Sequence, residues 1–184
     1  GGDYTAPGTC NSGTGTHAWN AGSIGKFNYA IGLDGTNDYI LVTDPGTGSA
    51  LDMSDSFSTS VWINPTVVSG NDKWFLSKGD GTDSNYYSYY CTVGGDAGCV
   101  APAVGCGTWD GSTANEVTYA TTLSTSTWYN IVCTMDDANN TIRLYINGKL
   151  VGTNSSATMD PNNAVNNGEM RIGRERDSFD YYFD

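Results

Sequence analysis

Residues 128–148 read WYNIVCTMDDANNTIRLYING, and this stretch decides the fold. Apolar side chains occupy every second position in residues 129–135 and again in residues 142–146. An alternation with a period of two places these side chains on one face of an extended strand. Residues 137–140 suit a turn between the two halves, and Asn147-Gly148 suits the positive-φ positions of a second tight turn. The stretch therefore predicts an antiparallel meander of three strands.

The rest of the chain has the same character, because its apolar runs are short and are separated by Gly, Asp, Asn and Ser. We expect further strands at residues 29–33, 38–43, 57–64, 73–78, 86–92, 116–121 and 170–173. The fold class is all-β, and a two-sheet antiparallel β-sandwich of one domain fits the length of 184 residues. Residues 1–23 are expected to form an extended lead-in, and residues 24–184 the sandwich.

The charge of the chain excludes some partners. Eight basic residues against 20 acidic ones give a formal net charge of -12. Nucleic acid and anionic lipid surfaces need clustered Lys and Arg, so neither is expected as a partner. No apolar run reaches the roughly 18 residues that span a bilayer, so direct membrane insertion is not expected either.

Five cysteines indicate an oxidising, extracellular compartment, since no CxxC pair or neighbouring His suggests zinc. Cys133 falls on the inward face of its strand and is expected to be a buried free thiol. The other four cysteines then form two bridges with three possible pairings, of which we favour Cys91 with Cys99 and Cys10 with Cys106. On this interpretation the segment 94–111 is a long cross-linked loop.

Six motifs in order give the chain a resemblance to a known family, and no one of them is diagnostic alone. They are LDGTNDYI at residues 33–40, FSTSVWI at 57–63, LSKGD at 76–80, WYNIV at 128–132, LYING at 144–148 and RIGR at 171–174. Together they resemble the concanavalin A-like lectin/glucanase superfamily in its laminin G-like branch, over roughly residues 24–184. The resemblance implies a jelly-roll sandwich, extracellular use, frequent calcium binding, and binding to glycans or proteins.

One departure from that pattern concerns the end of the chain. Members of this branch usually have a last strand after the segment that here reads Tyr181-Tyr-Phe-Asp184. Three explanations stay open: the natural protein continues, a neighbouring subunit donates the strand, or this version does without it. Strand donation would make the protein an assembly subunit.

Catalytic chemistry is not expected. Retaining glycosidases need two carboxylates about 5 Å apart. The resemblance implies that a hydrolase of this superfamily would carry them as alternating acidic residues on one face of a strand, and this chain has no such pattern. Asp136 and Asp137 are instead adjacent and lie in the expected turn, and the single histidine, His17, lies in the lead-in without a nucleophile constellation.

Calcium is a stronger expectation, because it takes six to eight oxygen ligands of the kind that Asp and Asn provide. Asp34, Asn37 and Asp38 surround one turn, and Asp177 and Asp180, with the terminal Asp184, would complete a structural Ca2+ site if the C-terminus folds back. The alternative is that Asp34-Gly35 and Asn37-Asp38 only form a hairpin turn.

Aromatic residues supply the candidate ligand contacts. Trp109 and Asp110 lie in the loop-forming segment GTWDG, and Tyr87 and Tyr89 lie in a run with aromatics on both strand faces. The alternative for the tyrosines is burial in the core, where Trp62 and Trp128 are also expected.

The leading functional interpretation is a secreted or surface-displayed, non-catalytic recognition domain that binds a glycan or a cell-surface protein, with calcium as a structural ion. The alternative is a self-associating structural subunit of a filament, adhesin or virion decoration, and a glycoside hydrolase ranks third.

Overall fold

The computed structural model describes residues 25–46, 48–53, 55–79, 87–95, 103–109, 113–157, 168–175 and 181–184. Its strands are β1 Ile40–Val42, β2 Phe57–Ile63, β3 Lys73–Gly79, β4 Tyr87–Gly94, β5 Ala103–Trp109, β6 Ala114–Ala120, β7 Tyr129–Asp136, β8 Thr141–Ile146, β9 Lys149–Asn154 and β10 Met170–Ile172, with a 3-10 turn at Asp137–Asn139. No helix in the described ranges has the length and apolar character to cross a membrane.

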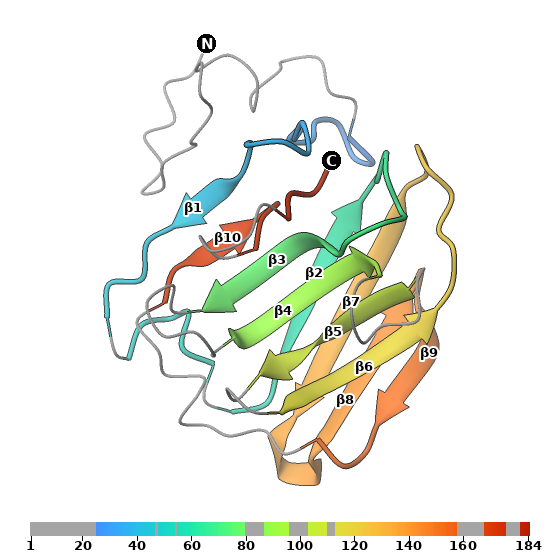
Figure 1. Ribbon diagram of the computed structural model, residues 1–184. Coiled ribbons are helices and arrows are strands. Elements are labelled where there is room, and N and C mark those ends of the chain that lie inside the picture. The colour runs from blue at the N-terminus through green and yellow to red at the C-terminus, as the bar shows by residue number, and fades with distance from the viewer. Residues whose placement is uncertain are drawn as a thin grey trace.

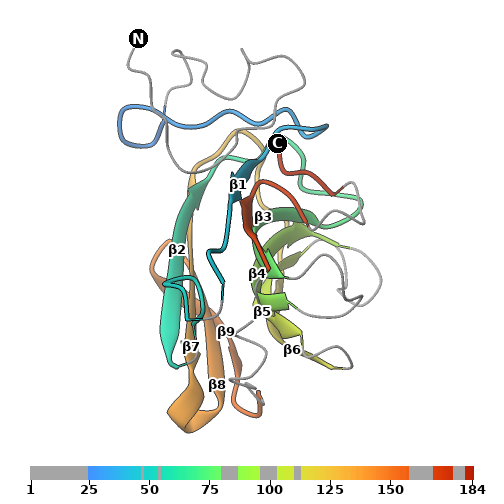
Figure 2. The ribbon, with the colours of Figure 1, turned by 90° about the vertical axis from the view of Figure 1, so that its left-hand side faces the viewer.

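The strands form two sheets that face each other (Figures 1 and 2). One sheet has six strands in the order β1-β10-β3-β4-β5-β6, and the other has four in the order β2-β7-β8-β9. Every pairing between these named strands is antiparallel. The predicted all-β antiparallel sandwich is therefore confirmed.

The meander expected from residues 128–148 is formed by β7, β8 and β9. Asn140 ends the first turn in the left-handed conformation with φ 49°. Asn147 and Gly148 have φ values of 51° and 79°, as the second tight turn requires. The alternation is also confirmed, since burial alternates along β7 and Ile142 and Leu144 of β8 are fully buried.

Two expectations about strands are wrong. Residues 30–33 form no strand, and the expected loop 94–111 contains β5, which pairs with β4 on one side and β6 on the other. The sequence pattern did not indicate β5 because Gly105 and Gly107 have low β propensity. At Gly107 a Cβ atom would lie 2.4 Å from the carbonyl oxygen of Asn115, so the close approach of β5 to β6 requires a glycine.

The core lies between the sheets and joins apolar residues from both. The six-stranded sheet contributes Phe75, Leu76, Tyr89, Val93 and Val104, and the four-stranded sheet contributes Ile63, Ile131, Met135, Ile142 and Leu144. Burial of this apolar surface is the main stabilising term of such a sandwich.

A disulfide between Cys106 of β5 and Cys133 of β7 joins the two sheets through this core, with Cα atoms 6.4 Å apart. The predicted pairings are therefore wrong: Cys106 does not bond Cys10, Cys133 is not a free thiol, and Cys91 is free and buried instead of bonded to Cys99. The error follows from the missed strand, because a loop cysteine would not have faced Cys133. Cys10 and Cys99 lie outside the described residues.

Candidate functional site

A groove of about 610 Å³ is lined in part by residues 61–64 at the end of β2 and by Phe183 and Asp184. The end of β2 and the C-terminus lie at the same end of the sandwich (Figures 1 and 2). Residues 25–33 cross this end of the molecule above the strands. The lining combines aromatic, aliphatic and a few polar side chains: Lys26, Phe27, Tyr29, Ala30, Ile31, Gly32, Leu33, Val61, Trp62, Ile63, Asn64, Thr66, Phe75, Trp128, Ile172, Phe183 and Asp184. A concave, largely apolar site with few polar groups is the usual form of a small-ligand site.

The rim of the groove is built by a tight turn. The backbone N–H of Gly25 donates to the carbonyl oxygen of Asn28 at 2.9 Å, and Asn28 has φ 66°. The turn carries Lys26 and Phe27 to Trp62, where Phe27 meets the indole edge to face at 5.5 Å between ring centroids. The ammonium of Lys26 lies 5.2 Å from the same ring centroid. An exposed aromatic cluster results, in which Phe27 is 70% exposed and Trp62 38% exposed.

One wall of the groove comes from the ends of β2 and β7. Burial alternates along β2, which turns Val61 and Ile63 inward and Trp62 outward. Ile63 pairs with Tyr129, so Asn64 and Trp128 continue the wall just beyond the two strands. The expectation that Trp62 belongs to the core is wrong, and Trp128 is only half-buried.

The C-terminal segment adjoins this wall and adds to the lining. The backbone N–H of Thr66 donates to the carbonyl oxygen of Asp184 at 3.1 Å, and the hydroxyl of Thr66 donates to Asp184 Oδ2 at 2.5 Å. Phe183 packs against Phe75 with ring centroids 6.0 Å apart. Asp184 lies so close to Gly35, which has φ 68°, that a Cβ there would sit 2.7 Å from the Asp184 Cβ. The C-terminus is thereby held against both the groove and the turn at residues 34–38.

Two oxygen atoms on the groove lining are buried and accept no hydrogen bond within the described part of the chain. They are Asn64 Oδ1 and Asp184 Oδ1. A buried acceptor without a partner is destabilising by about 1–3 kcal/mol, so such atoms are unusual in a folded protein. Both atoms are acceptors that a hydrogen-bond donor could satisfy, although neither is exposed to solvent as the side chains stand.

The predicted calcium residues are only partly brought together. Asp34 Oδ1 accepts hydrogen bonds from the backbone N–H groups of Thr36, Asn37 and Asp38. These bonds hold the pKa of Asp34 below its usual value, and the bond from Asn37 has the largest effect. Asn37 is exposed, whereas Asp38 is 2% exposed and its Oδ1 has no hydrogen-bond partner among the described residues.

The described residues contain no group of three or more His, Cys, Asp or Glu that could hold a metal ion. Asp177 and Asp180 fall outside the described ranges. The expected return of the chain end is present, because Asp184 lies beside Gly35.

The predicted ligand aromatics are distributed differently. Tyr89 is 3% exposed and packs against Phe57 in the core, so its predicted role in ligand contact is wrong. Burial, followed by the charges of Asp44 and Asp52, raises the pKa of Tyr89. Tyr87 and Trp109 are cross-strand partners on β4 and β5, and Asp110 lies outside the described residues.

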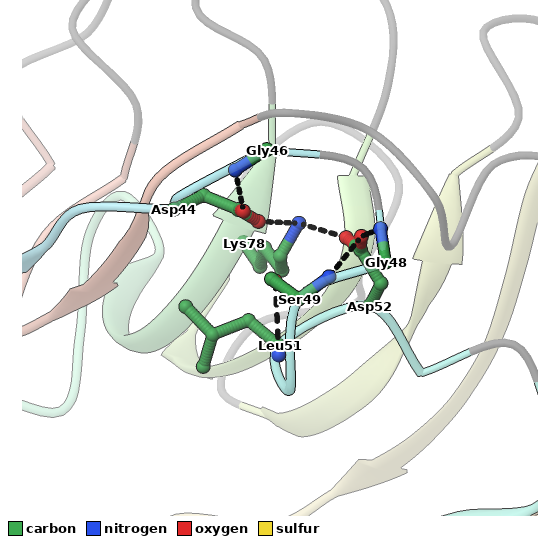
Figure 3. Close-up of polar contacts among 7 residues, drawn as sticks. All are labelled: Asp44, Gly46, Gly48, Ser49, Leu51, Asp52 and Lys78. Atoms are coloured by element: carbon green, nitrogen blue, oxygen red, sulfur yellow. Dashed lines mark hydrogen bonds and ion pairs between the residues drawn. The ribbon is translucent and has the colours of Figure 1, made fainter.

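A second polar cluster lies inside the sandwich, where Lys78 reaches the loop between β1 and β2 (Figure 3). Its ammonium is 2.9 Å from Asp44 Oδ2 and 3.1 Å from Asp52 Oδ1, and the Lys78 side chain has no exposure. The free carboxylate oxygens accept from the backbone, Asp44 from Gly46 and Asp52 from Gly48 and Ser49.

Lys78 offsets one of the two carboxylate charges in this buried cluster, and backbone N–H groups stabilise the remaining one. Burial alone would raise the pKa of Asp44, but the hydrogen bonds from Lys78 and Gly46 outweigh it, and the net shift is downward. Because all three side chains are closed to solvent, the cluster holds the loop at residues 44–52 and offers no ligand site.

Sequence reasoning missed most of the groove, although one signal for it was present. The alternation of Phe57, Thr59, Val61 and Ile63 already assigns Trp62 to the outer face together with two serines. An outward Trp followed two residues later by Asn64 is a pattern that a ligand site would use. No local signal identifies Lys26, Phe27 or Asp184, which reach the groove through the tertiary fold.

A family model described as the concanavalin A-like lectin/glucanases superfamily matches residues 34–184. The match spans most of the chain and agrees with the sandwich observed. The chain belongs to this superfamily, as its sequence motifs predicted. A comparison with curated proteins finds no match.

Several solved structures share the fold at low identity. The CBM40 module of the Ruminococcus gnavus IT-sialidase, bound to α2,3-sialyllactose, is 17% identical with a TM-score of 0.56, and the match covers 76% of this chain and 82% of that one. Domain 4 of AbnA, a GH43 extracellular arabinanase from Geobacillus stearothermophilus in complex with arabinotriose, is 17% identical with a TM-score of 0.55, covering 88% and 68%. The binding domain of Paraclostridial Mosquitocidal Protein 1 is 14% identical with a TM-score of 0.61, covering 88% of this chain and 39% of that one.

Proposed function

We propose that this chain is a non-catalytic carbohydrate-recognition domain that works in an extracellular or surface-exposed setting and binds its sugar in the groove at the end of the sandwich. The observation that carries the proposal is the groove itself. It combines an outward Trp62, flanked by Phe27, with Asn64 and Asp184, each of which has a buried acceptor oxygen without a partner among the described residues. Sugars have apolar faces that pack on aromatic rings and hydroxyls that satisfy such acceptors.

The superfamily and its neighbours support the same class of ligand. Two structural neighbours hold bound saccharides, sialyllactose in the sialidase module and arabinotriose in the arabinanase domain. At 17% identity these proteins share the fold with this chain, so the choice of sugar has to come from this chain's own residues.

A binding role without catalysis is favoured by the carboxylates of the site. Glycoside hydrolysis by the usual route needs two of them on either side of the scissile bond. Among the described lining residues Asp184 is the one acid. Asp136 and Asp137 are placed at the turn between β7 and β8, where Asp136 accepts from the backbone N–H of Asn139.

The extracellular setting is supported by the Cys106–Cys133 disulfide, since such bonds persist in oxidising compartments. A net charge of -12 also keeps an exported domain soluble and away from anionic surfaces.

Calcium remains part of the proposal as a structural ion near the turn at residues 34–38. Asp38 Oδ1 supports it, because this oxygen is buried, has no hydrogen-bond partner in the described part of the chain and would be satisfied by a hard cation. Asp34, Asn37, Asp177 and Asp180 are the other proposed ligands. A bound ion there would fix the turn that packs against Asp184 and so steady one wall of the groove.

The proposal is tested by glycan-array screening, followed by calorimetry with the strongest hit. Trp62→Ala and Phe27→Ala should each weaken binding at least about tenfold, or about 1.4 kcal/mol. Neither should unfold the domain, because Phe27 is 70% exposed and Trp62 38% exposed. Leu150→Ala is the matched control, as Leu150 is 48% exposed on β9 outside the groove lining. A protein that binds no glycan, or whose Trp62→Ala variant binds like the parent, contradicts the proposal.

A further inference from the structure

We propose that the groove selects neutral saccharides over acidic ones, with Asn64 and Asp184 receiving hydrogen bonds from sugar hydroxyls while the sugar ring packs on Trp62. This inference rests on the proposed function and specifies the chemical class of its ligand. It follows from which polar atoms the groove leaves unsatisfied.

The unsatisfied atoms are both acceptors. Asn64 Oδ1 and Asp184 Oδ1 are buried, and neither has a hydrogen-bond partner among the described residues. The other carboxylate oxygen of Asp184 is already occupied by the hydroxyl of Thr66 at 2.5 Å, which fixes the orientation of the group. A ligand in contact with this wall must therefore bring donors, and hydroxyl groups are the donors that a neutral sugar provides in abundance.

An acidic sugar fits this wall poorly. Its carboxylate or sulfate brings acceptors that would face two acceptor oxygens, one of them on the carboxylate of Asp184. Like charges placed together without solvent are strongly unfavourable. The chain as a whole adds to this discrimination, because its net charge of -12 repels anionic polymers at longer range.

Lys26 is the one basic side chain on the described lining, and it would favour the opposite selectivity. Its ammonium, however, is exposed at the rim and lies over the Trp62 ring at 5.2 Å from the centroid. An exposed charge is screened by water and salt, so its attraction for an anion is small. Its place over the indole is also one that a stacked sugar ring can take, so Lys26 is expected to move aside when the ligand binds.

The experiment measures binding of matched glycan pairs that share a core and differ in one acidic group, such as an oligoglucoside and the oligoglucuronide of the same linkage, by array and then by calorimetry. The neutral member should bind at least about tenfold more tightly than the acidic one. Asp184→Asn keeps an acceptor at the wall and removes the charge, so it should reduce the discrimination between the neutral and the acidic member to less than about threefold. Asn64→Leu should weaken neutral binding about tenfold.

Two controls separate the site from general charge effects. Asp55→Asn makes the same change of charge at an exposed residue that precedes β2, at the far end of that strand from Trp62, and should leave the discrimination unchanged. Lys26→Ala should not weaken neutral binding. Melting curves of each variant confirm that the domain is folded.

The outcomes separate this inference from the proposed function. No binding to any glycan defeats the proposed function and this inference with it. If the neutral and acidic members bind equally well, the chain is still a carbohydrate-binding domain, but its proposed selectivity is overturned. The same holds if the acidic members bind more tightly and this binding is lost in Lys26→Ala. An Asp184→Asn variant with unchanged discrimination also overturns the role given to Asp184.

Discussion

Cys91 of β4 is the direct cross-strand partner of Cys106 of β5, yet Cys106 is bonded to Cys133 in the opposite sheet. Three cysteines thus lie in one layer of the core, with Thr59 of β2 completing it, 3.6 Å from the Cys91 sulfur. The disulfide therefore links the two sheets, and the thiol of Cys91 stays free and buried beside it.

The first prediction concerns this bond. A cross-link that closes a loop of 27 residues should stabilise the domain by about 3.5 kcal/mol on the chain-entropy model. Cys106→Ala/Cys133→Ala should lose about that amount, as measured by urea denaturation, while keeping the native circular dichroism spectrum. Cys91→Ala is the control and should lose less. A double variant as stable as the parent would contradict the structural role of the bond.

The second prediction concerns the buried thiol. Burial raises the pKa of Cys91 to about 12, with the hydrogen bond to Thr59 acting weakly in the other direction. Because the neutral thiol is favoured in the folded state, its contribution is fully present below the thiol's ordinary pKa and is lost as the pH rises from there to about 12.

The unfolding free energy should therefore fall by about 1 kcal/mol more between pH 8 and pH 10 in the parent than in Cys91→Ala. Tyr89→Phe should remove a further part of the slope, since the pKa of Tyr89 is also raised. Equal slopes for the parent and Cys91→Ala would show that the thiol ionises as freely in the folded protein as in the unfolded chain.

The third prediction concerns the buried cluster of Lys78, Asp44 and Asp52. Removing one partner leaves uncompensated charge inside the sandwich, so Lys78→Met should destabilise the domain by about 3–5 kcal/mol in urea denaturation. The triple variant Asp44→Asn/Asp52→Asn/Lys78→Met should be more stable than the single variant, because it keeps acceptors for the loop N–H groups without buried charge. A triple variant less stable than Lys78→Met would argue against charge as the cause.

The fourth prediction concerns calcium. If an ion satisfies Asp38, addition of EDTA to protein purified with calcium should lower the melting temperature by several degrees, and excess calcium should restore it. Asp38→Asn should lose most of this response. An EDTA curve that overlays the calcium curve would remove calcium from the proposal and leave the glycan groove standing.

The parts of the fold that local patterns describe could be predicted from the sequence. The meander of β7 to β9 depends on strict alternation and on Asn147-Gly148, and both signals act within a few residues. β5 could not be predicted in this way, because Gly105 and Gly107 are selected by the nearness of β4 and β6 and not by strand propensity. Cys106 lies on β5, so the pairing of Cys106 with Cys133 could not be predicted without that strand.

The candidate site was predictable to a smaller extent. The superfamily followed from ordered motifs, and the outward position of Trp62 follows from the alternation of β2. In the groove Asp184 meets Phe27 and Asn64, which both lie more than a hundred positions earlier in the sequence. Loop segments that converge only in the tertiary fold leave no periodic trace in the sequence.

The position of Lys78 has a consequence for where the domain can work. The positive charge that holds residues 44–52 between the sheets is carried by a side chain of β3 and not by a diffusible ion. Its local concentration is set by the fold and does not fall on dilution. That loop should therefore keep its shape in fluids poor in divalent ions, and any ion dependence of the domain should be confined to the turn beside Asp38 and the groove wall that it supports.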